Sequence, residues 1–303
     1  MTDGAEIIMV KSVQDMIDYM DNLTYPQAVS TRAVRPLRMS LLVPRTTQLK
    51  PAILYVPGGG FISAEYGKYI EMRMALAAAG FVVAAAEYRV IPDTFPAPVV
   101  DGKAAVRFLR QHAAPWGIDP QRIGVLGDSA GGWLAQMLAM TNGETAFEQG
   151  DFTHQSSSVQ VAVSLYGISD LRNIGAGFPD AIQRVHQSPA VTEALLVHGP
   201  AFGEFAGATI HDSTEKALRA SPIGWLSGPK PPLLILHGSA DTLVSPQQSA
   251  TLYQVLIAAG SPVEYRLVAG AGHGDLHWFQ PATIDRVVAW FRQTPGAPVT
   301  ASQ

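Results

Sequence analysis

Short apolar runs recur along the chain and alternate with longer segments of helical periodicity. The runs have the length and composition of buried strands, and they occupy residues 36–43, 52–56, 81–86, 122–126, 159–166, 232–237 and 263–269. The segments with an apolar residue at every third or fourth position occupy residues 67–80, 97–113, 130–140, 246–260 and 281–293. Strands that alternate with helices predict an α/β fold with a mostly parallel sheet covered on both faces.

This alternation is interrupted once, over residues 172–221, where glycines, histidines and short helical pieces separate one predicted strand from the next. We therefore predict a single domain over residues 1–303, with a small lid insertion at 172–221. Gly80 and Gly260 each follow a helical segment, as expected of the left-handed residue that ends a helix.

The composition excludes several classes of function. The formal net charge is −4 and there is no basic run, so the chain lacks the positive surface that nucleic-acid binding requires. No stretch reaches the roughly 18–20 consecutive apolar residues that span a membrane. The absence of cysteine excludes disulfides, a thiol nucleophile and thiolate metal sites. The N-terminus opens with acidic residues and lacks the basic start of a secretory signal, which predicts a cytoplasmic protein.

The segment "GDSAG", residues 127–131, fits the pattern G-x-S-x-G and lies between a predicted strand and a predicted helix. Glycines on both sides of Ser129 allow a strained turn that lifts the hydroxyl out of the sheet, above a helix N-terminus that favours negative charge. The alternative is a small residue at a tight turn. The strand and helix around the motif favour a nucleophilic serine.

A serine hydroxyl needs a base and an orienting carboxylate to act as a nucleophile near neutral pH. Asp241 and His273 each follow a predicted strand, in the order Ser, Asp, His. Loops after parallel strands emerge at the same edge of a sheet, so the three residues can converge there. Taken alone, Asp241 is better explained as a helix cap or a turn residue.

Two nearby residues are rivals for these roles. His277 is the alternative base, but His273 lies nearer the strand end and between glycines that leave the backbone free to aim its ring inward. Asp275 is a weaker orienting group because it is too close in sequence to His273 to approach from a separate loop. The two histidines are four residues apart, like a zinc pair, yet the glutamate of H-E-x-x-H is absent, and we predict no metal site.

A glycine-rich turn, "YVPGGGF" at residues 55–61, follows another predicted strand. Glycines let backbone N–H groups approach a developing oxyanion. A phosphate loop is the other meaning of such a cluster, but neither nucleotide-binding glycine pattern is present. An oxyanion loop is favoured, and a simple turn remains the alternative.

Several of these motifs together resemble one family. The segments are "LRMSLLVP", "PAILYVPGGGF", "AEYRVIPDTFPAPVVDGKAAVRFLR", "GIDPQRIGVLGDSAGGWLA", "ASPIGWL", "PPLLILHGSADTLVSP" and "VAGAGHG". In order and spacing they are similar to α/β-hydrolase carboxylesterases of the hormone-sensitive-lipase and feruloyl-esterase-like kind. The resemblance covers roughly residues 36–141 and 221–293.

The resemblance implies Ser129 as nucleophile, His273 as general base and acid, and Asp241 as its orienting partner. It also implies that the N–H groups of Gly59, Gly60 and Ala130 form the oxyanion hole. The chain departs from the family at one point. Such esterases usually carry a histidine before the glycines, and here the residue is Pro57, which leaves the holding of this loop and the substrate preference open.

Other residues near these motifs have less specific meanings. In such families Arg89, Asp93 and Asp101 are mostly structural, and Asp101 fits a buried scaffold contact better than a catalyst. The aromatic residues at hand could line a substrate pocket or pack in the core; they are Phe61, Tyr66, Trp133 and Trp225.

The predicted reaction is hydrolysis of a small carboxylic ester, with short-chain or aromatic acyl groups, through an acyl-enzyme and without a cofactor. Two alternatives use the same machinery on amide bonds, an arylformamidase and a peptidase of the prolyl-oligopeptidase type. A third is a binding protein of hydrolase fold, which the intact Ser, Asp and His argue against. The predicted partner is the ester substrate alone, and a homodimer is left open.

Overall fold

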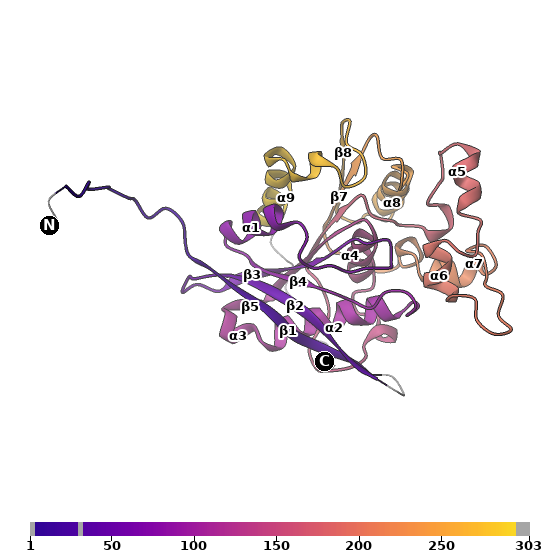
Figure 1. Ribbon diagram of the computed structural model, residues 1–303, viewed down its shortest axis with the longest axis horizontal. Coiled ribbons are helices and arrows are strands. Elements are labelled where there is room, and N and C mark those ends of the chain that lie inside the picture. The colour runs from indigo at the N-terminus through magenta and orange to yellow at the C-terminus, as the bar shows by residue number, and fades with distance from the viewer. Residues whose placement is uncertain (1–3, 30–32, 295–303) are drawn as a thin grey trace.

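The computed structural model describes residues 4–29 and 33–294. Within them the core is one eight-stranded sheet in the order β1-β2-β4-β3-β5-β6-β7-β8 (Figure 1). Its strands are β1 (Ile17–Val29), β2 (Val34–Pro44), β3 (Lys50–Val56), β4 (Val82–Ala86), β5 (Ile118–Asp128), β6 (Val161–Leu165), β7 (Leu233–Gly238) and β8 (Val263–Val268). β2 runs antiparallel to β1 and to β4, and all other pairs are parallel. The predicted mostly parallel α/β sheet is confirmed.

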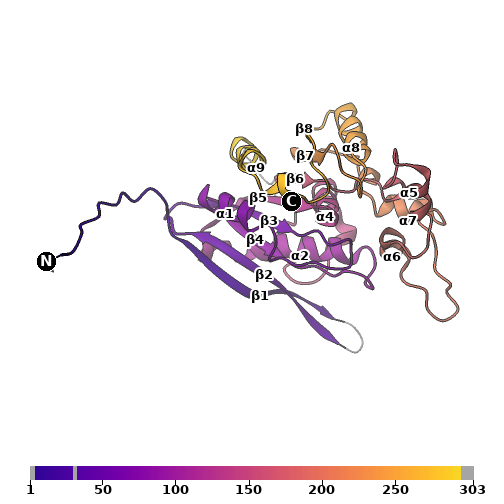
Figure 2. The same cartoon turned by 45° about the horizontal axis from the view of Figure 1, so that its top comes forward.

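Helices cover both faces of this sheet. They are α1 (Ile70–Ala78), α2 (Ala97–Gln111), α3 (Ala113–Trp116), α4 (Ala130–Met140), α5 (Asp180–Val185), α6 (Thr192–His198), α7 (Thr214–Arg219), α8 (Gln247–Ala258) and α9 (Pro281–Gln293). Figure 2 shows α1 and α9 on one side of the sheet and α2 on the other. Successive side chains of a strand point to opposite faces, so Leu54 joins the core under α2 and α4 while Ile53 and Tyr55 join the core under α1 and α9.

Strand β1 was not predicted from the sequence. β1 lies at the sheet edge, contains Pro26, and shifts register against β2 between Met20 and Leu23 and again between Thr24 and Gln27. Each bulge moves later side chains to the other face and breaks the alternation on which strand prediction depends. Proline, which has no N–H, is tolerated there because the outward-facing N–H groups of an edge strand have no neighbouring strand to pair with. The seven strands predicted from apolar runs are confirmed, with ends shifted by a few residues at most.

The segment between β6 and β7 contains α5, α6 and α7 and lies to one side of the sheet (Figure 1). Its two ends are tied together, because the N–H of Leu171 donates to Ser221 Oγ at 2.9 Å and the N–H of Ile223 donates to the carbonyl of Ser169 at 3.1 Å. Between these ends the segment reaches the loop after β7, where the N–H of Ser245 donates to the carbonyl of Ile174. Its role as a lid stays a prediction.

No helix within residues 4–29 and 33–294 combines the length and the apolar character needed to cross a lipid bilayer.

Candidate active site

Ser129 sits at the sharp turn from β5 into α4, with φ 53° and ψ −120°. A non-glycine residue adopts this conformation only under strain, which the neighbouring contacts enforce. A Cβ on Gly127 would lie 2.0 Å from the carbonyl oxygen of Gly131, and a Cβ on Gly131 would lie 2.1 Å from that of Val56. Gly127 is therefore required for the end of β5 to approach the start of α4, and Gly131 for the start of α4 to approach the end of β3.

The structure brings the three predicted catalytic residues together. Ser129 Oγ lies 2.8 Å from His273 Nε2, and His273 Nδ1 lies 2.8 Å from Asp241 Oδ2. With a hydrogen on Nδ1 facing the carboxylate, Nε2 is left as the acceptor for the serine proton. This is the geometry of a nucleophile, a base and an orienting acid.

Asp241 is buried in a pocket of donors. Its Oδ1 accepts the N–H groups of Leu243 at 2.9 Å and Val244 at 3.0 Å, while Oδ2 faces His273 and, at 3.3 Å, His237 Nε2. Burial alone raises the pKa of this carboxyl, but the hydrogen bonds from His237, His273 and Val244 outweigh it and hold the pKa of Asp241 well below its usual value. The carboxylate is thus kept ionised beside the base.

His237 is a functional candidate that the sequence analysis missed. It is the penultimate residue of β7 and has no exposed surface. Its Nε2 is 3.0 Å from the carbonyl of Val244, a pure acceptor, so Nε2 carries the hydrogen and Nδ1 accepts from the hydroxyl of Ser249 at 2.6 Å. The same Nε2–H points to Asp241. The sequence signal that could have identified His237 is a histidine at the end of a buried strand, four residues before an aspartate.

The two alternative candidates, His277 and Asp275, pair with each other. His277 Nδ1 is 2.8 Å from Asp275 Oδ1, at the surface, and Asp275 Oδ2 accepts the N–H of Gly272 at 2.6 Å. Asp275 therefore braces the loop that carries His273. The His273 ring also packs edge-on against Tyr166, with ring centroids 4.7 Å apart. In the described part of the chain no group of three His, Cys, Asp or Glu side chains could hold a metal ion.

The glycine-rich turn after β3 is fixed by the residue before the nucleophile. Asp128 Oδ1 accepts the N–H of Gly58 at 2.9 Å and the hydroxyl of Tyr55 at 2.8 Å. Burial raises the pKa of Asp128, against the lowering effect of these two hydrogen bonds. The carbonyl of Pro57 accepts the hydroxyl of Tyr88 at 2.5 Å. Side chains beneath the loop thus hold it in the absence of the usual histidine.

The predicted oxyanion donors come from the turn after β3 and from the first residue of α4. Gly59 and Gly60 have φ of 158° and 61°, and a Cβ on Gly59 would be 2.2 Å from the carbonyl of Ser63. Ala130 is the first residue of α4, so its N–H has no acceptor within the helix. Their joint action on a substrate oxygen stays a prediction.

The aromatic residues of the sequence analysis are mostly packing residues in this structure. Trp133 is fully buried, donates from Nε1 to the carbonyl of Ala220 at 2.8 Å, and packs edge-on against Phe61 at 5.3 Å. The half-buried Tyr66 donates its hydroxyl to Asp21 of β1 at 2.9 Å. Contact of these three side chains with a substrate remains a prediction.

Arg89 and the buried Asp101 form a bidentate ion pair, with Arg89 Nη2 2.8 Å from Asp101 Oδ1. This matches their expected structural role.

Three exposed apolar side chains adjoin the catalytic loops. Ile62 follows the glycine-rich turn, Leu243 donates its N–H to Asp241, and Leu276 comes three residues after His273. They expose 61%, 62% and 77% of their surface. Isolated exposed apolar residues need no explanation, but one on each of the three loops that carry the glycine-rich turn, Asp241 and His273 provides apolar surface on all three.

Comparison with known proteins places this site in context. LipM of Mycobacterium tuberculosis, named a probable carboxylic ester hydrolase, is 30% identical over 205 residues, which are 67% of this chain and 44% of LipM. Esterase LipC of the same organism is 30% identical over 237 residues, 75% of this chain and 54% of LipC. The Arabidopsis thaliana isoprenylcysteine alpha-carbonyl methylesterase ICME is 25% identical over 80% of this chain and 55% of its own. The chain spans about half the length of these curated relatives.

Solved structures show the same fold. A truncated carbohydrate esterase from gut microbiota superposes with a TM-score of 0.75 at 23% identity, over 94% of this chain and 98% of that one. The butyrate-bound esterase Est2 of Thermogutta terrifontis has a TM-score of 0.68 at 23% identity, over 93% and 94% of the two chains. The family model BD-FAE matches residues 39–256, which include Ser129 and Asp241. The chain has the α/β-hydrolase fold and belongs to the BD-FAE family.

Proposed function

We propose that this protein hydrolyses carboxylic esters through an acyl-enzyme on Ser129. The observation that carries the proposal is the unbroken chain of hydrogen bonds from Ser129 through His273 to Asp241, with both links at 2.8 Å. His273 Nε2 takes the serine proton as Oγ forms a bond to the ester carbonyl carbon. The resulting imidazolium lies against the ionised Asp241, which stabilises it.

The first tetrahedral intermediate collapses when the bond to the alcohol oxygen breaks and His273 returns its proton to that oxygen. Water then attacks the acyl-serine and gives a proton to His273. The bond between the acyl carbon and Ser129 Oγ breaks, His273 returns the proton to Oγ, and the carboxylic acid leaves. The N–H groups of Gly59, Gly60 and Ala130 would donate to the oxyanion in both steps. Asp128 supports this indirectly, because it fixes the N–H of Gly58 and with it the start of the loop.

The proposed substrates are small esters with short-chain or aromatic acyl groups. The exposed side chains of Ile62, Leu243 and Leu276, on the loops of the site, would offer apolar contact for such a group. The segment at 172–221 contacts the loop after β7 and is the proposed lid. The relatives' printed names include a methylesterase and an acetyl esterase, which agrees with small groups on one side of the ester.

The test is hydrolysis of p-nitrophenyl esters from acetate to decanoate, with methyl ferulate and an anilide beside them. We expect turnover of the short esters, loss of turnover in Ser129→Ala, and wild-type turnover in the control Ser261→Ala, whose serine lies before β8 at the opposite edge of the sheet. Intact mass after reaction with paraoxon should show one adduct on the wild type and none on Ser129→Ala. Equal turnover by Ser129→Ala would refute the mechanism, and a preference for decanoate would refute the substrate class.

A further inference from the structure

The N-terminal segment is an apolar arm that the body of the protein does not cover. Residues 4–16 precede β1 and lead away from the sheet in both ribbon views (Figures 1 and 2). Ile7, Ile8, Met9 and Val10 are 71–91% exposed. Burying large apolar side chains is favourable, so four adjacent ones left in water indicate a contact with another surface.

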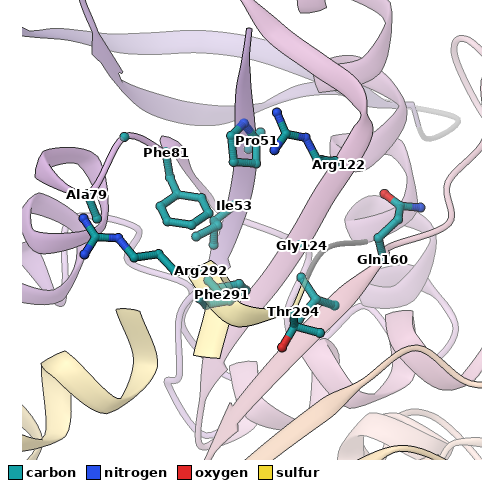
Figure 3. Close-up of a pocket in the computed structure, with 13 residues that line it drawn as sticks. Pro51, Ile53, Ala79, Phe81, Arg122, Gly124, Gln160, Phe291, Arg292 and Thr294 are labelled. Carbon is teal, nitrogen blue, oxygen red and sulfur yellow. The ribbon is translucent and has the colours of Figure 1, made fainter. Parts of the chain in front are cut away.

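A suitable surface lies at the amino edge of the sheet, where the parallel strands begin, whereas the loops of the active site follow the ends of those strands. A cavity of about 240 Å³ opens there between the ends of α1 and α9. Figure 3 shows Ile53, Phe81 and Phe291 gathered in it, with Arg122 and Arg292 on opposite sides. The cavity is thus apolar inside, with Arg292 at its rim as a cation, since Arg122 is already paired with Asp119.

The arm and the cavity share one edge of the molecule. β1 begins at Ile17 opposite Pro44, and the N–H of Arg45 donates to the carbonyl of Met16 at 2.8 Å, which sets the direction in which the arm leaves. A second hollow, lined by Asp15 at the root of the arm, shares Gly80 and Arg122 with the first. The surface between the arm and the cavity is therefore continuous.

The sequence of the arm opposes a return to its own cavity. Residues 5–16 contain neither glycine nor proline, the residues that most favour a chain reversal. An arm that stays extended reaches a neighbouring molecule. In a two-fold dimer each arm would meet the same edge of the other copy, because such an interface uses one surface twice.

The charges of the arm and of the cavity are also complementary. Glu6 precedes the apolar residues of the arm, and Arg292 forms no ion pair with any residue in the ranges 4–29 and 33–294. We propose that residues 6–10 of each chain bind in the amino-edge cavity of a second copy and join two chains in an arm-exchanged dimer. The active sites lie at the other edge and stay open.

The mass of the full chain in solution tests the dimer, independently of any catalytic activity. We expect the wild type to have twice the mass of one chain by light scattering, and Ile8→Asp and Ala79→Arg to have the mass of one. Ala79 lines the cavity, whereas the adjacent Ala78 is exposed and does not, so Ala78→Arg is the matched control. Ile257→Asp, on the exposed side of α8, is the control for the arm.

A monomeric wild type, or a dimer that survives both Ile8→Asp and Ala79→Arg, would overturn the proposal. So would a dimer broken equally by Ala78→Arg or Ile257→Asp. Circular dichroism and thermal unfolding of each variant separate loss of dimer from loss of fold.

The exchange itself is tested by disulfides, because the chain contains no cysteine. Met9→Cys and Ala79→Cys are made as separate variants, mixed and oxidised. A band at twice the chain mass in the mixture, stronger than in either variant alone, is expected for an arm bound in the other copy. In the double variant Met9→Cys/Ala79→Cys, a monomeric band that contains an internal disulfide would show that the arm folds back onto its own chain, contrary to the proposal.

Discussion

Two buried aspartates flank the nucleophile, one on the oxyanion side of the catalytic edge and one on the acid–base side. Asp128 receives neutral donors, the N–H of Gly58 and the hydroxyl of Tyr55, and burial raises its pKa. Asp241 is also desolvated, but it faces two histidines and two backbone N–H groups, and its pKa is lowered.

The difference shows that partners, and not burial, decide what a carboxyl does. On the oxyanion side the oxygen of Asp128 serves as a hydrogen-bond acceptor that ties a loop to a strand, and a negative charge adds little to that role. On the acid–base side the proposed mechanism needs the charge of Asp241, because it would stabilise a protonated His273.

Replacing each carboxyl by an amide should separate the two roles most widely. Asp241→Asn removes the charge and presents an N–H₂ group that disfavours the required tautomer of His273, so we expect kcat for p-nitrophenyl acetate to fall on the order of 10⁴-fold. Asp128→Asn keeps an oxygen acceptor for Gly58 and Tyr55, and we expect less than about a tenfold loss. Equal losses in the two variants would contradict the comparison.

His237 should matter only on the acid–base side. Its Nε2–H is shared between Asp241 and the carbonyl of Val244. Losing a hydrogen bond to a charged group costs about 1.5–3 kcal/mol, which corresponds to roughly 10–100-fold in kcat if the cost falls on the transition state. We therefore expect this loss in His237→Leu, with KM little changed.

His237→Gln restores a donor at the position of Nε2 and should recover most of the kcat. If His237 only fills space, His237→Leu should behave like the wild type in kcat and His237→Gln should be the less stable variant.

The tyrosine on the oxyanion side is expected to affect stability more than rate. Tyr55→Phe removes one of the two donors to the buried Asp128 and should lower the free energy of unfolding by about 1–3 kcal/mol. Urea unfolding measures this. In the double variant Tyr55→Phe/Asp128→Asn the cost should shrink, since an amide is cheaper to leave partly unpaired than a carboxylate.

The pH dependence of stability should have opposite signs for the two aspartates. The pKa of Asp241 is lower in the folded than in the unfolded chain, so its stabilising contribution is complete above about pH 5 and is lost as pH falls through the ordinary carboxyl range. The pKa of Asp128 is raised on folding, so its ionisation costs stability as pH rises through the folded value.

Unfolding free energies at neutral and at acidic pH test this. The loss of stability in Asp241→Asn should be largest at neutral pH and shrink in acid. Asp128→Asn should instead gain on the wild type as pH rises, and the same trend in both variants would contradict the comparison.

Much of the fold was predictable because buried parallel strands and amphipathic helices leave strong periodic signals. The helix over residues 130–140 was predicted with the bounds it has. β1 could not be predicted in the same way, because its bulges and Pro26 break the alternation. Edge strands depend on their neighbour for pairing, and that neighbour is not visible in local periodicity.

The triad was predictable from motif order and strand ends. His237 was not singled out, since a histidine closing an apolar strand looks like any core residue until Asp241 folds back over it. The hydrogen bonds that hold the glycine-rich loop could not be predicted for a similar reason. Asp128 and Tyr55 are 73 residues apart, and only strand pairing between β3 and β5 brings them together.

The two ends of the segment between β6 and β7 are hydrogen-bonded to each other, and this affects how the protein can change during evolution. At this base the N–H of Leu171 donates to Ser221 Oγ and the N–H of Ile223 donates to the carbonyl of Ser169, and residues 175–219 take no part in either bond. That stretch can therefore lengthen, shorten or be exchanged while β6, β7 and the Ser129–His273–Asp241 group keep their positions. Natural selection can then alter which substrates the proposed esterase accepts without having to rebuild the residues proposed to act on them.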